Sequence, residues 1–108
     1  MEWRALEALS NRFAAEKIAR NNGYYHIKRE SATVCQLAFS ITGHCGETLY
    51  QPLIKVRREA DVAIPYYLLD VNAQPIKRLQ RVSPSDAAAL DQALAALIEK
   101  FQQDLVYA

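Results

Sequence analysis

Glycine, cysteine and histidine are scarce in this chain of 108 residues, which has 3 Gly, 2 Cys and 2 His. The glycines, Gly23, Gly43 and Gly46, cannot form the G-x-G-x-x-G or Walker loops that hold nucleotide phosphates. The cysteines and histidines show neither C-x-x-C nor H-x3-H spacing, so the usual zinc-binding patterns are missing as well. We therefore expect no metal site and no small-molecule cofactor.

Long hydrophobic stretches are also missing. The longest uncharged apolar run covers residues 62–69 and contains Pro65, whereas a membrane-spanning helix needs about 20 apolar residues. Charged side chains recur throughout residues 2–20, which leaves no room for the apolar segment of an export signal. We expect a cytoplasmic protein without membrane contact, in which Cys35 and Cys45 are reduced thiols.

The chain does have the composition of a folded globular domain, with 51% hydrophobic and 23% charged residues. A chain of this length buries roughly two-thirds of the surface that its unfolded form exposes, so it needs no disulfide or metal to fold. We predict a single α+β domain over residues 1–108.

Two helices are expected, one at each end of the chain. Residues 2–20 have Trp3, Leu6, Leu9 and Phe13 at intervals of three and four, although Ile18 falls about half a turn away from this stripe. The second helix is expected to begin after Ser83-Pro84-Ser85-Asp86, which has an N-cap serine, and to run to about Leu105. Its buried stripe is predicted to comprise Leu90, Leu94, Leu97, Ile98, Phe101 and Leu105.

Between the helices the apolar period changes to two, which predicts a meander of four or five antiparallel strands. The predicted strands cover residues 24–29, 35–42, 49–57, 62–71 and 76–82. The expected register of the first hairpin sets Ile27 opposite Leu37, and that of the second sets Leu37 opposite Ile54 and Ile41 opposite Tyr50. We predict an α+β fold with an N-terminal helix, this sheet, and a C-terminal helix packed on the sheet.

The strand over residues 62–71 is apolar on both faces. Strict alternation places Val62, Ile64, Tyr66 and Leu68 on one face, with Tyr67 among the residues on the other. One helix covers only one of these faces, so a partner is expected to cover the remaining apolar surface.

The loop Gly43-His44-Cys45-Gly46-Glu47 is the one segment where a nucleophile, a base and an acid are adjacent in sequence. It admits two interpretations. In one, His44 favours the thiolate of Cys45 and the chain is a thiol-dependent enzyme. In the other, the glycines and polar residues simply form a hairpin loop. The sequence favours the second.

The net charge of +1 conceals an uneven distribution. Residues 24–82 have 8 basic side chains against 5 acidic ones, whereas residues 83–108 have one lysine against 4 acidic residues. Lys28, Arg29, Arg57 and Arg58 are expected at the same rim of the sheet, and Tyr24 lies on one of the same strands. Basic and aromatic residues on a sheet are typical of proteins that bind single-stranded nucleic acid.

The sequence favours a small, non-catalytic interaction module, regulatory or adaptor in kind. We expect a homodimer, or a complex with another protein, through an apolar face that includes Trp3, Ile18, Tyr66 and Tyr67. The alternative is single-stranded nucleic-acid binding through Lys28, Arg29, Arg57, Arg58 and Tyr24. A thiol enzyme that uses Cys45 and His44 is the third and least favoured hypothesis.

Overall fold

The computed structural model describes residues 2–11, 18–20, 23–71 and 75–106. Two helices flank six antiparallel strands, which pair in sequence order from β1 to β6. The elements are α1 (Trp3–Ser10), β1 (Ile18–Arg20), β2 (Gly23–Arg29), β3 (Val34–Thr42), β4 (Thr48–Glu59), β5 (Val62–Asp70), β6 (Lys77–Gln80) and α2 (Pro84–Val106). The predicted α+β meander is confirmed, and β1 is an additional strand.

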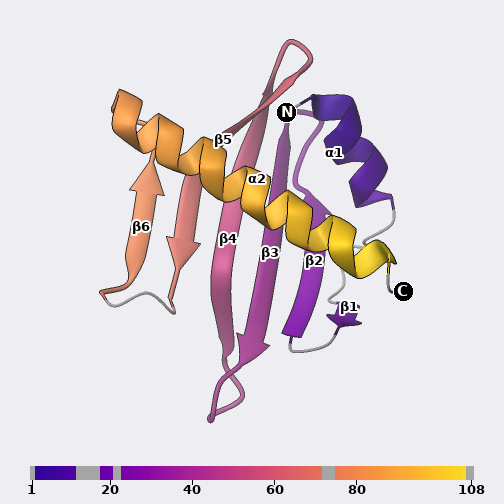
Figure 1. Cartoon of the computed structure of the whole chain (residues 1–108), viewed down its shortest axis with the longest axis vertical. Coiled ribbons are helices and arrows are strands. Elements are labelled where there is room, and N and C mark those ends of the chain that lie inside the picture. The colour runs from indigo at the N-terminus through magenta and orange to yellow at the C-terminus, as the bar shows by residue number, and fades with distance from the viewer. Residues whose placement is uncertain (1, 12–17, 21–22, 72–74, 107–108) are drawn as a thin grey trace.

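Helix α2 crosses one face of the sheet diagonally, from β6 toward β2 (Figure 1). Its side chains Leu90, Leu94, Leu97, Ile98 and Phe101 are buried, as predicted, and the predicted sixth member, Leu105, has a side chain outside the described part of the structure. The same hydrophobic cluster contains residues of α1 and of four central strands: Trp3, Leu6, Leu9, Tyr25, Ile27, Cys35, Leu37, Phe39, Ile54, Val56, Ala63 and Leu68. Both helices therefore pack on one face of the sheet, here called the helix face. Neither described helix is long and apolar enough to span a membrane.

The start of α2 follows the predicted cap. The backbone N–H of Asp86 donates to Ser83 Oγ at 3.2 Å, and the N–H of Ala87 donates to the Ser83 carbonyl at 2.9 Å. Pro84 occupies the first helical position, where a missing N–H costs no helical hydrogen bond. Local sequence therefore determines where this helix begins.

The prediction of one helix over residues 2–20 is wrong. Helix α1 ends at Ser10, and Ile18–Arg20 form strand β1, in which Ile18 pairs with Tyr25 and Arg20 with Gly23. Phe13 lies outside the described residues. Ile18 is apolar but lies off the stripe of the predicted helix, which indicated in the sequence that the helix does not continue to this residue. A short segment that cannot extend the buried stripe instead completes the hydrogen bonding of the β2 edge.

The registers of the two central hairpins match the prediction over most of their length. Ile27 pairs with Leu37, and Leu37 with Ile54. The predicted pair of Ile41 with Tyr50 is wrong, because Ser40 pairs with Tyr50 and Ile41 with Leu49. One extra residue on β4 shifts the register beside Pro52, which has no N–H to donate to the ladder.

A second bulge lies between β4 and β5. Lys55 pairs with Tyr67, but the next residue, Val56, pairs with Pro65. Tyr66 is thus an extra residue on β5 with no partner opposite it in the β4 register. Such an insertion interrupts the alternation of side chains between the two faces of the sheet. The face to which Tyr66 points therefore does not follow from simple alternation along β5.

Replacement of Ser83 by alanine should lower the free energy of unfolding by about 1 kcal/mol, because the N–H of Asp86 loses its capping acceptor. Urea denaturation followed by circular dichroism measures the change. Gln92→Ala, at an exposed position in the middle of α2, is the control, and its stability should stay within about 0.5 kcal/mol of the parent. Equal losses in the two variants would contradict a role for the cap.

Candidate binding face on the sheet

The face of the sheet opposite both described helices, here called the open face, is built by alternation along the strands. Residues such as Ile27, Leu37 and Ile54 point into the core on the helix face, so their neighbours in the strands point the other way. The open face has tyrosine, glutamine and basic side chains, together with small or apolar residues such as Ala38 and Leu53, which are buried on it. Its composition suits contact with water and with polar partners.

One row of the open face crosses five strands. Lys28 pairs with Gln36, Gln36 with Lys55, Lys55 with Tyr67 and Tyr67 with Gln80. Adjacent strands lie about 4.8 Å apart, so the side chains of this row are close neighbours across the sheet. Lys55 lies in its centre, on β4. The row therefore places the Lys55 side chain between the amide of Gln36 and the ring of Tyr67.

Lys55 is half-buried, and within the described part of the chain its ammonium group has no hydrogen bond or ion pair. The aliphatic stem of a lysine can lie along a sheet while its ammonium group stays in contact with solvent, and the Lys55 ammonium is not among the buried unpartnered polar atoms. It is therefore a cation in the middle of the sheet that a ligand can reach.

Lys55 lies in a hollow of about 640 Å³ on the open face. Of the described residues that line it, Lys55, Arg57 and Arg81 are basic and none is acidic. Leu53 and Leu69 provide apolar surface, and Gln36 and Gln80 provide amide groups. The hollow thus combines positive charge with apolar surface, which favours an organic anion as its ligand.

Three tyrosines, Tyr50, Tyr66 and Tyr67, line the same hollow. Strict alternation placed Tyr66 and Tyr67 on opposite faces, and the predicted register placed Tyr50 beside Ile41. Both expectations are wrong. The bulge on β4 turns Tyr50 to the open face, and the bulge on β5 does the same for Tyr66. Pro52 and Pro65 were the available signals, because proline within a strand is typical of bulges and edges.

The two arginines of the hollow are held by other groups. Arg57 Nε donates to Glu59 Oε1 at 2.9 Å, and its guanidinium lies 5.7 Å from the centre of the Tyr66 ring. Arg81 donates to the Pro65 carbonyl at 3.1 Å and to Asp91 Oδ1 at 3.0 Å. These contacts fix the guanidinium groups in place, and the Glu59 and Asp91 carboxylates reduce the charge that Arg57 and Arg81 offer to a ligand.

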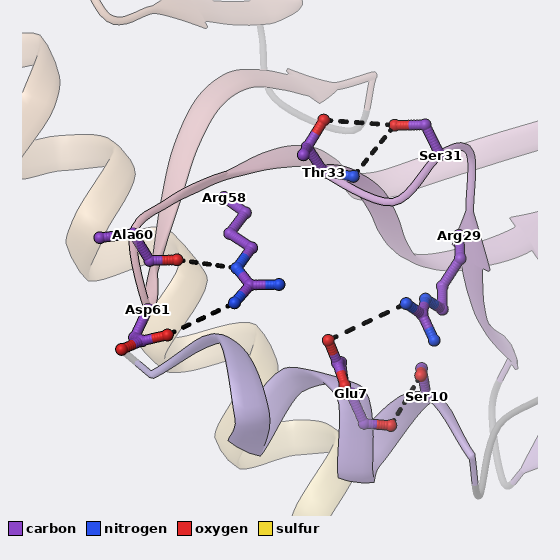
Figure 2. Close-up of polar contacts among 8 residues, drawn as sticks. All are labelled: Glu7, Ser10, Arg29, Ser31, Thr33, Arg58, Ala60 and Asp61. Carbon is purple, nitrogen blue, oxygen red and sulfur yellow. Dashed lines mark hydrogen bonds and ion pairs between the residues drawn. The ribbon is translucent and has the colours of Figure 1, made fainter.

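The four basic residues expected at one rim do not form one site. Figure 2 shows Arg29 directed at Glu7 of α1, 3.9 Å away, and Arg58 directed at the Ala60 carbonyl and at Asp61, at 2.7 and 3.4 Å. Arg29 and Arg58 pair with Cys35 and Ala63, whose side chains belong to the core on the helix face.

By contrast, Lys28 and Arg57 lie on the open face. Tyr24 lies there too, in a row with Ser40 and Tyr50.

The residues of the expected interaction face are also separated. Trp3 is only 2% exposed, because α1 packs its indole into the core, so it is not part of the protein surface. The backbone N–H of Trp3 donates to the Asp61 carbonyl at 2.8 Å, which attaches the helix to the β4–β5 turn. The side chain of Ile18 lies outside the described part of the structure. Tyr66 and Tyr67 are the two members that reach the open face.

In the loop that follows β3, the Glu47 carboxylate organises the backbone. Its Oε2 accepts a hydrogen bond from the Cys45 N–H at 2.9 Å, while the Gly43 N–H donates to the Glu47 carbonyl at 2.8 Å. Gly46 has a φ of 80°, which favours glycine. In the described residues no hydrogen bond joins the His44 imidazole to the Cys45 thiol. No three described His, Cys, Asp or Glu side chains cluster as metal ligands.

The two cysteines should differ in reactivity. Cys45 is exposed, whereas Cys35 is buried and its burial raises the pKa of the thiol to about 11. In the native protein at pH 8, a thiol reagent should modify Cys45 rapidly and Cys35 only after denaturant is added. Mass spectrometry of Cys45→Ser tests this directly. Rapid labelling of that variant without denaturant would contradict the burial of Cys35.

The open face is thus a mixed surface, in which tyrosine, glutamine and basic side chains lie beside Leu53 and Leu69 and Lys55 lies at the centre. A comparison with protein families, curated proteins and solved structures found no match to this chain.

Proposed function

We propose that this chain is a non-catalytic binding module that receives an anionic macromolecule on the open face of its sheet. The observation that carries the proposal is Lys55, half-buried on a central strand in a hollow lined by three basic and no acidic described residues. An anion in the hollow would pair with the Lys55 ammonium, which has no ion pair within the described residues.

The distribution of charge over the molecule supports the same orientation. Helix α2, on the helix face, has exposed Asp91 and Glu99 with exposed Lys100 as a single nearby cation among its described side chains. Asp91 is paired with Arg81 of the hollow, so the remaining difference between the two sides is Glu99 on the helix against Lys55 and Arg57 on the open face. Such a field favours the approach of an anionic partner toward the open face.

A second copy of the chain is a poor occupant of this face. In a two-fold symmetric dimer whose axis passes through the hollow, Lys55 of one copy would lie close to Lys55 of the other. Like charges brought together in an interface are unfavourable. The homodimer expected from the sequence would need another surface, and we propose a different molecule as the partner.

Neutralisation of Lys55 tests the proposal. Lys55→Gln should weaken binding to polyanions about fivefold to tenfold at low salt, and the slope of log K against log salt should fall by about one, as expected when one cationic contact is lost. Fluorescence anisotropy with labelled polyglutamate, heparin and oligonucleotides would measure both quantities.

The matched control is Lys77→Gln, which makes the same charge change on β6. Lys77 pairs with Asp70 and lies outside the hollow, so its substitution should change affinity less than twofold. Binding of none of the three polyanions, or equal effects of the two substitutions, would overturn the proposed function.

A further inference from the structure

The hollow on the open face combines cations with a cluster of planar rings. Tyr50, Tyr66 and Tyr67 all line it, and two of them do so because a bulge turns their side chains away from the helix face. β-bulges recur where a strand redirects a side chain toward a binding site. The rings are half-buried, so part of each ring is accessible.

The cations lie beside these rings. Lys55 is the direct cross-strand neighbour of Tyr67. The Arg57 guanidinium lies over one face of the Tyr66 ring, 5.7 Å from its centre, so a base would stack on the other face. On the far side of Tyr67 the cross-strand neighbour is Gln80, whose amide both donates and accepts hydrogen bonds. Tyr66 and Tyr67 thus each have a group next to them for a phosphate or for the polar edge of a base.

We infer that the anionic partner is a single-stranded nucleic acid, with bases that stack on Tyr66 and Tyr67 and a phosphate that pairs with Lys55. This inference rests on the proposed function, because it specifies the ligand of the same face. Phosphates would use the cations, bases would use the rings, and the flanking amides would contact base edges. An acidic polypeptide would use the cations alone.

The dimensions of the site favour a strand over a duplex or a folded domain. A hollow of about 640 Å³ lies within the range of roughly 300–1,000 Å³ that ligands of small-molecule size occupy. A short segment of single strand can place its bases there. In a duplex the base faces are already stacked on one another, so the tyrosines have no ring to contact.

The test separates stacking from charge. Tyr67→Leu should weaken binding of a labelled single-stranded oligonucleotide roughly tenfold, because one stacked base is lost. Tyr67→Phe keeps the ring and should bind within about twofold of the parent. Tyr66→Leu and Tyr66→Phe provide an independent pair if Leu at position 67 disturbs the fold, which circular dichroism would detect.

Three further ligands identify what the face recognises. An oligonucleotide of the same length with abasic sites retains the phosphates and should bind more weakly than the intact strand, with no difference between Tyr67→Leu and Tyr67→Phe. Duplex of the same sequence should also bind more weakly than the single strand. Polyglutamate binding should be unaffected by Tyr67→Leu.

The inference and the proposed function fail in different ways. If the Leu and Phe variants bind the intact single strand equally, or if the abasic strand binds as tightly as the intact one, nucleic-acid recognition is overturned. The proposed function would still stand in that case, provided that Lys55→Gln weakens polyglutamate or heparin binding and Lys77→Gln does not.

Discussion

The packing of one long amphipathic helix against one face of the sheet is the constraint on which the rest of the structure depends. Leu90, Leu94, Leu97, Ile98 and Phe101 bury a continuous stripe on the strands, and each such side chain contributes about 1.5–3 kcal/mol relative to exposure. Because α1 joins the same cluster, the described chain has no helix left for the opposite face. On that face, residues such as Ala38 and Leu53 are buried, and the long or amphipathic side chains of tyrosine, glutamine and lysine cover the sheet around them.

The character of the open face depends on two irregularities of the sheet. Uniform alternation would have directed Tyr50 and Tyr66 toward the helix face, where the core is already filled by residues such as Phe39 and Leu68. The bulges beside Pro52 and Pro65 avoid that conflict and place both rings in the hollow with Tyr67. A proline that cannot donate to the ladder thus has a consequence for the surface: it changes which side chains a partner meets.

The basic residues of this protein indicate where an anion could bind only once their ion pairs are known. Arg29 and Arg58 count as much as Lys55 in the composition, yet they lie beside Glu7 and Asp61 at the end of the sheet near α1. Arg81 lies beside Asp91 of α2. Exposed pairs of this kind contribute little stability, but they reduce the number of cations that a ligand would meet. Lys55 remains as the cation in the hollow without a partner among the described residues. The proposed function therefore depends more on this one residue than on the total number of basic side chains.

The sequence alone determined the elements whose signals are local. The Ser83 cap sets the start of α2, the period of 3.6 identifies its buried stripe, and the period of two identifies β2 to β5 and the register of the β2–β3 hairpin. Only the tertiary structure decided the end of α1, since β1 exists by pairing with the β2 edge, and the burial of Trp3, which requires the sheet beneath it. It also decided which face stays open and which tyrosines reach it. These features depend on contacts between residues far apart in the sequence and on single-residue shifts of register. Because the side-chain period of a strand is two, one inserted residue moves a side chain to the other face.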